Sequence, residues 1–132
     1  MTAFHLQIVT PDGLIYDGEA EQLTVCTIDG FVGIRAGHID YITALGMGEA
    51  RVEKDGQTRR AACIGGMLSV ENGRVRLVAT TFEWAEQIDK ARADRAYEKA
   101  KAVLESKSSS ERDIKLAEAK LKRALVRRSV AQ

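Results

Sequence analysis

The sequence predicts an α+β fold, in which an N-terminal antiparallel β-sandwich of eight to ten strands precedes a C-terminal antiparallel two-helix hairpin. Ten of the eleven glycines lie before residue 67, among short runs where apolar and polar residues alternate. From Glu83 onward the chain has neither glycine nor proline and is rich in residues that favour helices. This shift places a boundary near residues 82–87, so we assign residues 1–84 to a sandwich domain and residues 85–132 to a hairpin domain.

The strand predictions begin with FHLQIVT, in which Phe4, Leu6 and Ile8 share one face, and the turn TPDG at residues 10–13 ends this run. LIYD and QLTVCT follow, and Asp29-Gly30 is a hairpin signal before FVGI. The remaining runs are EARVE, TRRAACI, MLSV and RVRLVAT, separated by KDGQ, by Gly65-Gly66 and by Asn72-Gly73. Almost no segment is long enough for a crossover helix, which favours an antiparallel sandwich or a flattened barrel.

The C-terminal region predicts two helices of about 17 to 20 residues that lie antiparallel, because only a short polar serine run at residues 106–110 joins them. Ser110 followed by Asp113 forms a capping box for the second helix. The expected facing stripes are rich in alanine: Ala93, Ala96, Tyr97, Ala100, Val103 and Leu104 on the first helix, and Ile114, Ala117, Leu121, Ala124 and Leu125 on the second. Alanine buries little area, so we expect a hairpin that can detach or unfold.

Composition narrows the class of protein. The chain has 132 residues, of which 45% are hydrophobic, and this is enough for one modest core with an appendage. No apolar run approaches the roughly 18 residues of a membrane span, and the N-terminus lacks the features of a signal peptide. We therefore expect a soluble, unexported chain without direct membrane insertion, in which Cys26 and Cys63 are reduced thiols.

Charge is distributed unevenly between the two regions. Residues 1–84 carry seven Lys and Arg against eleven Asp and Glu, whereas residues 85–132 carry thirteen against eight. In the basic tail, Lys120, Arg123 and Arg127 share one helical face. A solvated face, an acidic protein surface or a phosphate-bearing ligand would each explain this pattern. Nucleic acid is a poor candidate, because only 5% of residues are aromatic.

Catalytic and metal sites are not indicated. His5 and His38 are isolated, no nucleophile motif accompanies them, and the cysteines lack metal-ligand spacing. Gly65-Gly66 is not followed by the Lys-Ser/Thr pair of a phosphate loop, so turns and a close approach of strands explain these glycines. We predict neither a catalytic residue nor a metal ligand.

Asp89 needs an explanation, because a helical period places this carboxylate on the same stripe as Ala93, Ala96, Ala100 and Val103. Either the helix has not entered its packed part at Asp89, or the carboxylate has a partner, which could be a cap, a cation or a ligand. A first-turn acid is stabilised by the helix N-terminus by about 0.3–1 kcal/mol, and Arg92 at i+3 could pair with it.

Several motifs together resemble the epsilon subunit of F-type ATP synthases. They are IVTPDG at residues 8–13, Gly33, Gly37-His38, IGGMLSV at residues 64–70, Ile88-Asp89 with Arg92-Ala93, and a closing LKRA with Arg127 and Ser129-Val130-Ala131. Each is weak alone, but their order and spacing are specific, and they cover nearly the whole chain.

This resemblance implies a ten-stranded sandwich and a non-catalytic rotor subunit that couples proton-driven rotation to ATP synthesis. The sandwich would contact the gamma subunit and the c-ring. The hairpin would extend into the alpha/beta catalytic hexamer and inhibit ATP hydrolysis. No cofactor is required. The subunit would be peripheral, at the cytoplasmic face of the bacterial plasma membrane.

The resemblance also implies that the folded-down hairpin binds ATP as a regulatory ligand. The family motif Ile-Asp-x-x-Arg-Ala corresponds here to Ile88, Asp89, Arg92 and Ala93, and Glu83, Arg123 and Arg127 match further nucleotide positions. Two residues depart from the family pattern. Lys99 replaces a common arginine, which weakens the expected phosphate contact, and Asp40 stands where proline is usual. A free nucleotide sensor remains the alternative, whereas an enzyme would require a nucleophile that the sequence lacks.

Overall fold

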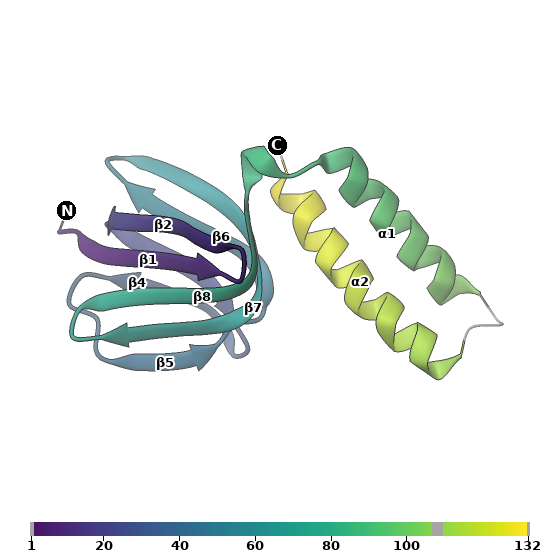
Figure 1. Cartoon of the computed structure of the whole chain (residues 1–132), viewed down its shortest axis with the longest axis horizontal. Helices are drawn as coiled ribbons and strands as arrows, with labels where there is room; N and C mark the ends of the chain where they lie inside the picture. The colour runs from purple at the N-terminus through teal and green to yellow at the C-terminus, as the bar shows by residue number, and fades with distance from the viewer. Residues whose placement is uncertain (1, 107–109, 132) are drawn as a thin grey trace. The chain divides into compact units, whose positions relative to one another are not determined.

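The structure is a computed structural model that describes residues 2–106 and 110–131. The chain divides into two units, Met1–Trp84 and Ala85–Gln132. Eight strands make up the first unit (Figure 1): β1 (Phe4–Thr10), β2 (Gly13–Ala20), β3 (Gln22–Thr27), β4 (Gly30–Arg35), β5 (Tyr41–Ala44), β6 (Met47–Lys54), β7 (Gln57–Glu71) and β8 (Arg74–Trp84).

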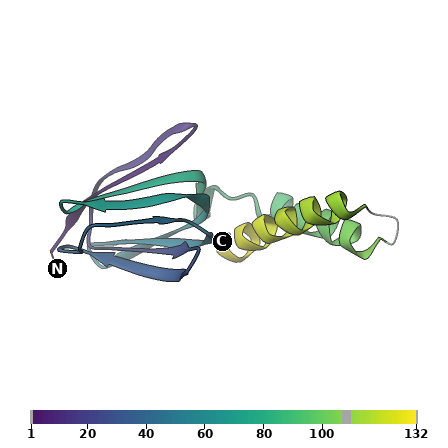
Figure 2. The same cartoon turned by 90° about the horizontal axis from the view of Figure 1, so that it is seen from below.

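The strands form one sheet in the order β2-β1-β8-β7-β6-β3-β4, with β5 also paired to β7. The sheet folds over on itself, so that the β1–β2 hairpin and the β3–β4 hairpin belong to different layers (Figure 2). All neighbouring strands are antiparallel except β1 and β8, which run parallel. The predicted fold class is confirmed, with fewer strands than the ten that the resemblance implies.

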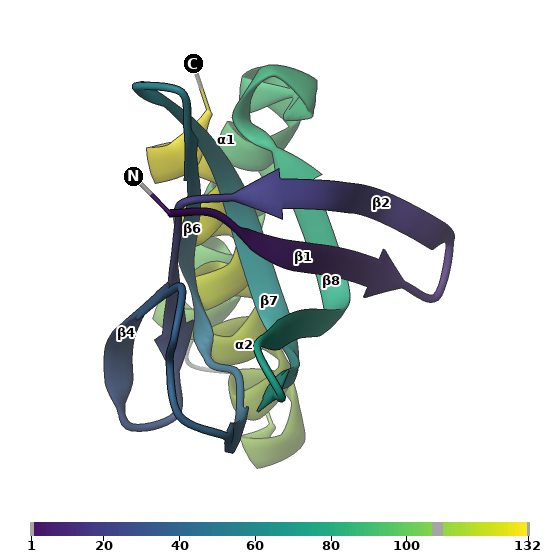
Figure 3. The same cartoon turned by 90° about the vertical axis from the view of Figure 1, so that its left-hand side faces the viewer.

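One predicted break between strands is wrong: β7 is a single strand of 15 residues that continues through the glycine pair. Gly65 and Gly66 have positive φ values of 71° and 116°, yet pairing with β8 continues on both sides of them. A Cβ atom on Gly66 would lie 2.0 Å from the carbonyl oxygen of Val78. The glycines therefore permit a close approach of two strands. Figure 3 shows β7 crossing between the β1–β8 side of the sheet and the β6 side.

One strand, β5, was not among the predicted runs, because its four residues are too few for a recognisable alternation. It pairs with the C-terminal half of β7, and β6 pairs with the N-terminal half. The two short strands therefore lie one after the other along the same long neighbour.

The core of the sandwich lies between the two layers and receives side chains from most of the strands. Its fully buried large members are Leu6, Ile8, Leu23, Val25, Ile34, Leu68 and Leu77. These residues alternate with exposed or half-buried ones along each strand, as expected for a sheet with one buried face. Burying each such side chain contributes about 1.5–3 kcal/mol.

The sequence motif Thr-x-Asp-Gly forms two turns by the same contacts. Thr10 Oγ1 accepts a hydrogen bond from the N–H of Asp12 at 3.2 Å, and Thr27 Oγ1 accepts one from the N–H of Asp29 at 3.1 Å. Each hydroxyl also donates to the carbonyl of the glycine that starts the next strand. Both threonines are buried. Each hydroxyl therefore finds its hydrogen-bond partners within its own turn.

The second unit contains the 3-10 turn η1 (Ala85–Gln87), α1 (Lys90–Glu105) and α2 (Glu111–Val130). The predicted capping box is confirmed: Ser110 Oγ accepts from the N–H of Asp113 at 3.1 Å, and the Asp113 carboxylate accepts from the N–H of Ser110. The middle of the predicted serine run, residues 107–109, lies outside the described residues. Helices α1 and α2 lie side by side and antiparallel (Figure 1).

Candidate ligand and docking surfaces

Asp89 is the N-cap of α1, so the helix begins only after this residue. Its Oδ1 atom accepts a hydrogen bond from the backbone N–H of Arg92 at 3.1 Å. An N-cap carboxylate satisfies one of the free N–H groups of the first turn and also faces the positive end of the helix dipole. Asp89 therefore precedes the packed stripe of α1, and its contact is with the backbone of Arg92.

Small side chains form the seam between the helices. Ala93 and Ala100 of α1 and Ala117 and Ala124 of α2 are buried there. Two residues expected in the stripes are instead exposed: Ala96, and Leu125, which is 50% exposed. Both lie at the edge of their stripe on the helical wheel, and a narrow alanine seam does not reach that far.

The helical period separates the charges of α1 into two flanks. Taking Ala93 and Ala100 as the buried direction, Arg92 and Lys99 lie on one flank, and Asp94 and Glu98 lie on the other. A contact between the helices agrees with this assignment. Asp94 Oδ1, on the second flank, lies 3.0 Å from Arg128 Nε of α2.

The same construction on α2 places Lys120, Arg123 and Arg127 on one flank of the buried direction given by Ala117 and Ala124. Two antiparallel helices that share a seam present corresponding flanks on the same side of the pair. Arg92, Lys99, Lys120, Arg123 and Arg127 therefore make up one side of the hairpin, which we call the basic face.

Six of the seven residues predicted for ATP binding belong to the hairpin unit. Arg92, Arg123 and Arg127 share the basic face, and Asp89 lies at the start of α1. Ile88 and Ala93 are buried, so Ala93 serves the helix seam. The seventh, Glu83, is in β8 of the first unit, where it pairs with Ala62 across the sheet. Within the described ranges, Arg92 and Arg123 form no ion pair, which leaves their guanidinium groups available.

Asp94, Tyr97 and Arg128 form a contact that sequence reasoning missed. The Arg128 guanidinium carbon lies 4.7 Å from the centroid of the Tyr97 ring, in addition to its contact with Asp94. Asp94 and Tyr97 are three residues apart in α1, but no spacing rule within one helix links either of them to Arg128. Only the rotation of α2 against α1 brings them together.

The outer surface of the sandwich carries an apolar row that crosses five strands. Register pairs Ala44 with Met67, Met67 with Val78, Val78 with Val9, and Val9 with Leu14. Directly paired residues project on the same face of a sheet, and these five are exposed or half-buried. Met67 and Val78 are 43% exposed and Leu14 is 59% exposed. We call Val9, Leu14, Ala44, Met67 and Val78 the apolar belt.

The neighbouring row of outward-facing residues is mostly polar, in contrast to the apolar belt. Ser69 pairs with Arg76, Arg76 with Gln7, and Gln7 with Asp17. Ile42, which pairs with Ser69, is the apolar member of this row and is 69% exposed. Outward positions of a solvated sheet are usually polar, so an apolar row of this length indicates a contact surface.

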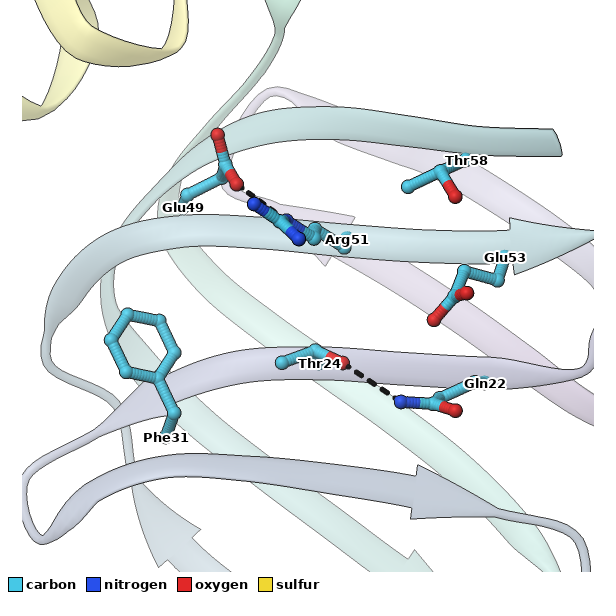
Figure 4. Close-up of a pocket in the computed structure, with 7 residues that line it drawn as sticks. All are labelled: Gln22, Thr24, Phe31, Glu49, Arg51, Glu53 and Thr58. Atoms are coloured by element: carbon cyan, nitrogen blue, oxygen red, sulfur yellow. Dashed lines mark hydrogen bonds and ion pairs between the residues drawn. The ribbon is translucent and has the colours of Figure 1, made fainter.

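A pocket of about 380 Å³ lies on another part of the sheet surface, over β3, β6 and the start of β7 (Figure 4). Several of the polar side chains at this pocket are held by hydrogen bonds to other residues of the sheet. Glu49 accepts hydrogen bonds from Arg51 Nε at 2.6 Å and from Arg60 Nε at 2.7 Å, and the Gln22 amide donates to Thr24 at 3.3 Å. These contacts hold the Glu49 carboxylate in place and leave it little capacity for a ligand.

No metal centre is found among the described residues, because no three His, Cys, Asp or Glu side chains gather there. His5 pairs with Asp17 at 2.5 Å, and the ring of His38 lies beside Tyr41. Both cysteines are free thiols, and burial raises the pKa of Cys63 to about 12. In the described ranges, no helix is long and apolar enough to span a membrane.

Two family models match the chain. The model described as ATP synthase, Delta/Epsilon chain, beta-sandwich domain matches residues 3–85. The model described as ATP synthase, Delta/Epsilon chain, long alpha-helix domain matches residues 86–132. Together they span both structural units.

Two curated relatives match over almost their full length. The ATP synthase epsilon chain of Bacillus velezensis is 43% identical over 131 residues, which are 99% of this chain and 98% of the relative. That of Ruminococcus albus is 38% identical over 132 residues, with the same coverage. Among solved structures, a chain of the Euglena gracilis mitochondrial ATP synthase has a TM-score of 0.82 and 25% identity, covering 92% of this chain and 77% of the other.

Proposed function

The chain belongs to the delta/epsilon-chain family of ATP synthase, whose members are non-catalytic subunits of that complex, and from this membership we propose that it couples rotation of the central stalk to ATP synthesis. In this proposal the sandwich binds the gamma subunit and the c-ring, and proton flow drives the rotation. The subunit is then a peripheral component at the cytoplasmic face of a bacterial plasma membrane.

The apolar belt is the observation that carries this proposal. It crosses the sheet from β5 to β2, and its side chains lie at the surface. Removing apolar surface from water contributes about 25 cal/mol per Å², so a complementary surface on gamma would gain stability wherever it covers the belt. A rotor subunit has to remain attached under load, and an apolar interface is suited to that requirement.

Co-purification with gamma tests the assignment of the belt. Met67→Lys with Val78→Lys puts two charges into the belt and should reduce gamma binding by at least about tenfold, because both charges would need to be desolvated. Ser69→Lys is the matched control on the next outward position of β7, and we expect it to bind normally. If the double variant folds and binds gamma as tightly as the parent, the belt is not the docking surface.

A regulatory role of the hairpin is the finer part of the proposal. The basic face would hold the phosphates of ATP through Arg92, Arg123 and Arg127, with Asp89 toward the base or ribose. In the extended state the same cations would face an acidic segment of the alpha/beta hexamer and inhibit hydrolysis. Both states use the same charges, so ATP binding and inhibition should exclude one another.

Calorimetric titration of the full chain with ATP, with and without magnesium, tests whether the hairpin binds ATP. Asp89→Asn preserves the N-cap but removes the charge, whereas Asp89→Ala removes both. Loss of ATP binding in Asp89→Asn, with the helix intact by circular dichroism, would support a ligand role. If the Asp89→Asn variant and the Arg123→Ala variant both bind ATP normally, the basic face does not bind the nucleotide and faces only the hexamer or solvent.

A further inference from the structure

Arg128 closes the end of the hairpin where the first turns of α1 lie beside the last turn of α2. Its Nε atom is 3.0 Å from Asp94 Oδ1, and its guanidinium covers the Tyr97 ring at 4.7 Å. Both charged side chains are less than half exposed, and Asp94 Oδ1 itself is almost sealed from water. No group in the described part of the chain donates a well-aligned hydrogen bond to that oxygen, so the charge of Arg128 is its main compensation.

This contact lies at the open end of the hairpin, opposite the loop that joins the two helices. At its other end the hairpin is closed covalently by the chain that joins α1 to α2. The seam between consists mainly of Ala93, Ala100, Ala117 and Ala124, which bury little area. Arg128, in the last turn of α2, also faces the favourable negative end of the dipole of that helix.

Arg128 is directed differently from its neighbours on α2. Arg123 and Arg127 lie on the basic face, whereas Arg128 lies over the seam and reaches the Asp94 flank. A ligand on the basic face therefore does not need to displace it. We propose that Arg128 is a latch that keeps the hairpin closed in the absence of nucleotide, with Asp94 and Tyr97 as its seat on α1. Any effect of the latch on ATP hydrolysis rests on the proposed function; the latch itself does not.

Hydrogen exchange of the backbone amides in α2, measured by mass spectrometry on the full chain without nucleotide, reports how often the hairpin opens. Arg128→Ala should accelerate exchange in the last turns of α2 by about three- to thirtyfold, because an ion pair and a cation–π contact are both lost. Asp94→Asn keeps the Tyr97 contact and should have a smaller effect. Lys122→Ala removes one positive charge from an exposed position of the same helix. It is therefore the control for the loss of charge alone.

The double variant Asp94→Asn with Arg128→Ala decides whether the residues act together. If Asp94 acts through Arg128, the double variant exchanges no faster than Arg128→Ala alone. Exchange in Arg128→Ala equal to that in Lys122→Ala, or fully additive effects in the double variant, would overturn the latch. No nucleotide is present, so a chain that fails to bind ATP in calorimetry would still give a clear result here.

Discussion

The carboxylate of Asp40 accepts a hydrogen bond from the backbone N–H of Asn72 at 3.0 Å, across 32 residues of sequence. Asn72 begins the tight turn between β7 and β8 and has a positive φ of 50°. Glu21 makes the equivalent contact with the N–H of Asp55, at 2.9 Å, in the turn between β6 and β7. Two hairpin tips are thus each tied by a carboxylate from a distant loop. This contact gives Asp40 a role at a position where the resemblance leads one to expect proline.

We predict that Asp40→Ala lowers the free energy of unfolding by about 0.5–1.5 kcal/mol, because the N–H of Asn72 loses its partner. Asp40→Asn keeps an acceptor oxygen and should cost less, whereas Asp40→Pro, with no acceptor, should resemble alanine. Urea denaturation of the three variants measures this order. Equal stability of the parent and Asp40→Ala would show that water replaces the carboxylate without loss.

Gly66→Ala should destabilise the sandwich by at least about 3 kcal/mol, because its new methyl group would collide with the backbone of Val78 at a residue with φ of 116°. Gly73→Ala is the matched comparison, since Gly73 also has a positive φ, of 79°, but has open space at its Cβ position. That change should cost about 1 kcal/mol. Similar losses for both in thermal or urea unfolding would mean that backbone conformation, and not the close approach, requires glycine at residue 66.

Glu49 should make the sandwich sensitive to acid. Burial raises the pKa of this carboxyl, but hydrogen bonds from Arg60 and Arg51 outweigh it, so its pKa in the folded chain lies below the ordinary 4.5. The carboxylate therefore contributes stability that is complete above pH 4.5 and is lost as the pH falls through the lower folded value. Glu49→Gln should lose less stability on acidification than the parent.

Urea midpoints at about pH 7 and about pH 3 measure this difference. Glu53→Gln, two outward positions further along β6, is the control for removing one carboxylate from the same surface. A parent and a Glu49→Gln variant with equal acid sensitivity would contradict the prediction.

Cys63 should resist alkylation in the native chain at neutral pH. Its pKa of about 12, raised by burial, leaves almost no thiolate, and the side chain is only 3% exposed. Iodoacetamide treatment followed by peptide mass spectrometry should find Cys63 unmodified until urea unfolds the sandwich. Cys26, which is partly exposed, provides the internal comparison. Rapid native modification of Cys63 would show that the strands around it open frequently.

Local sequence rules predicted the features that depend on neighbouring residues. Asp55-Gly56 and Asn72-Gly73 form tight turns because both positions tolerate positive φ, and Ser110 caps α2 because its hydroxyl reaches an N–H three residues ahead. The change of composition near residue 84 separates strand from helix. The break between strands at Gly65-Gly66 was wrong, because glycine permits either a turn or a close approach of two strands, and only the position of β8 decides between them.

The sequence by itself determined the fold class, the division into a strand region and a helix region, and the shared helical face of Lys120, Arg123 and Arg127, because alternation, helical period and capping are properties of short segments. Tertiary structure alone decided the parallel pairing of β1 with β8, the apolar belt and the contact of Arg128 with Asp94 and Tyr97. Each of these joins residues far apart in the chain. Their contact depends on strand register or on the rotation of one helix against another, and these are set by packing of the whole unit.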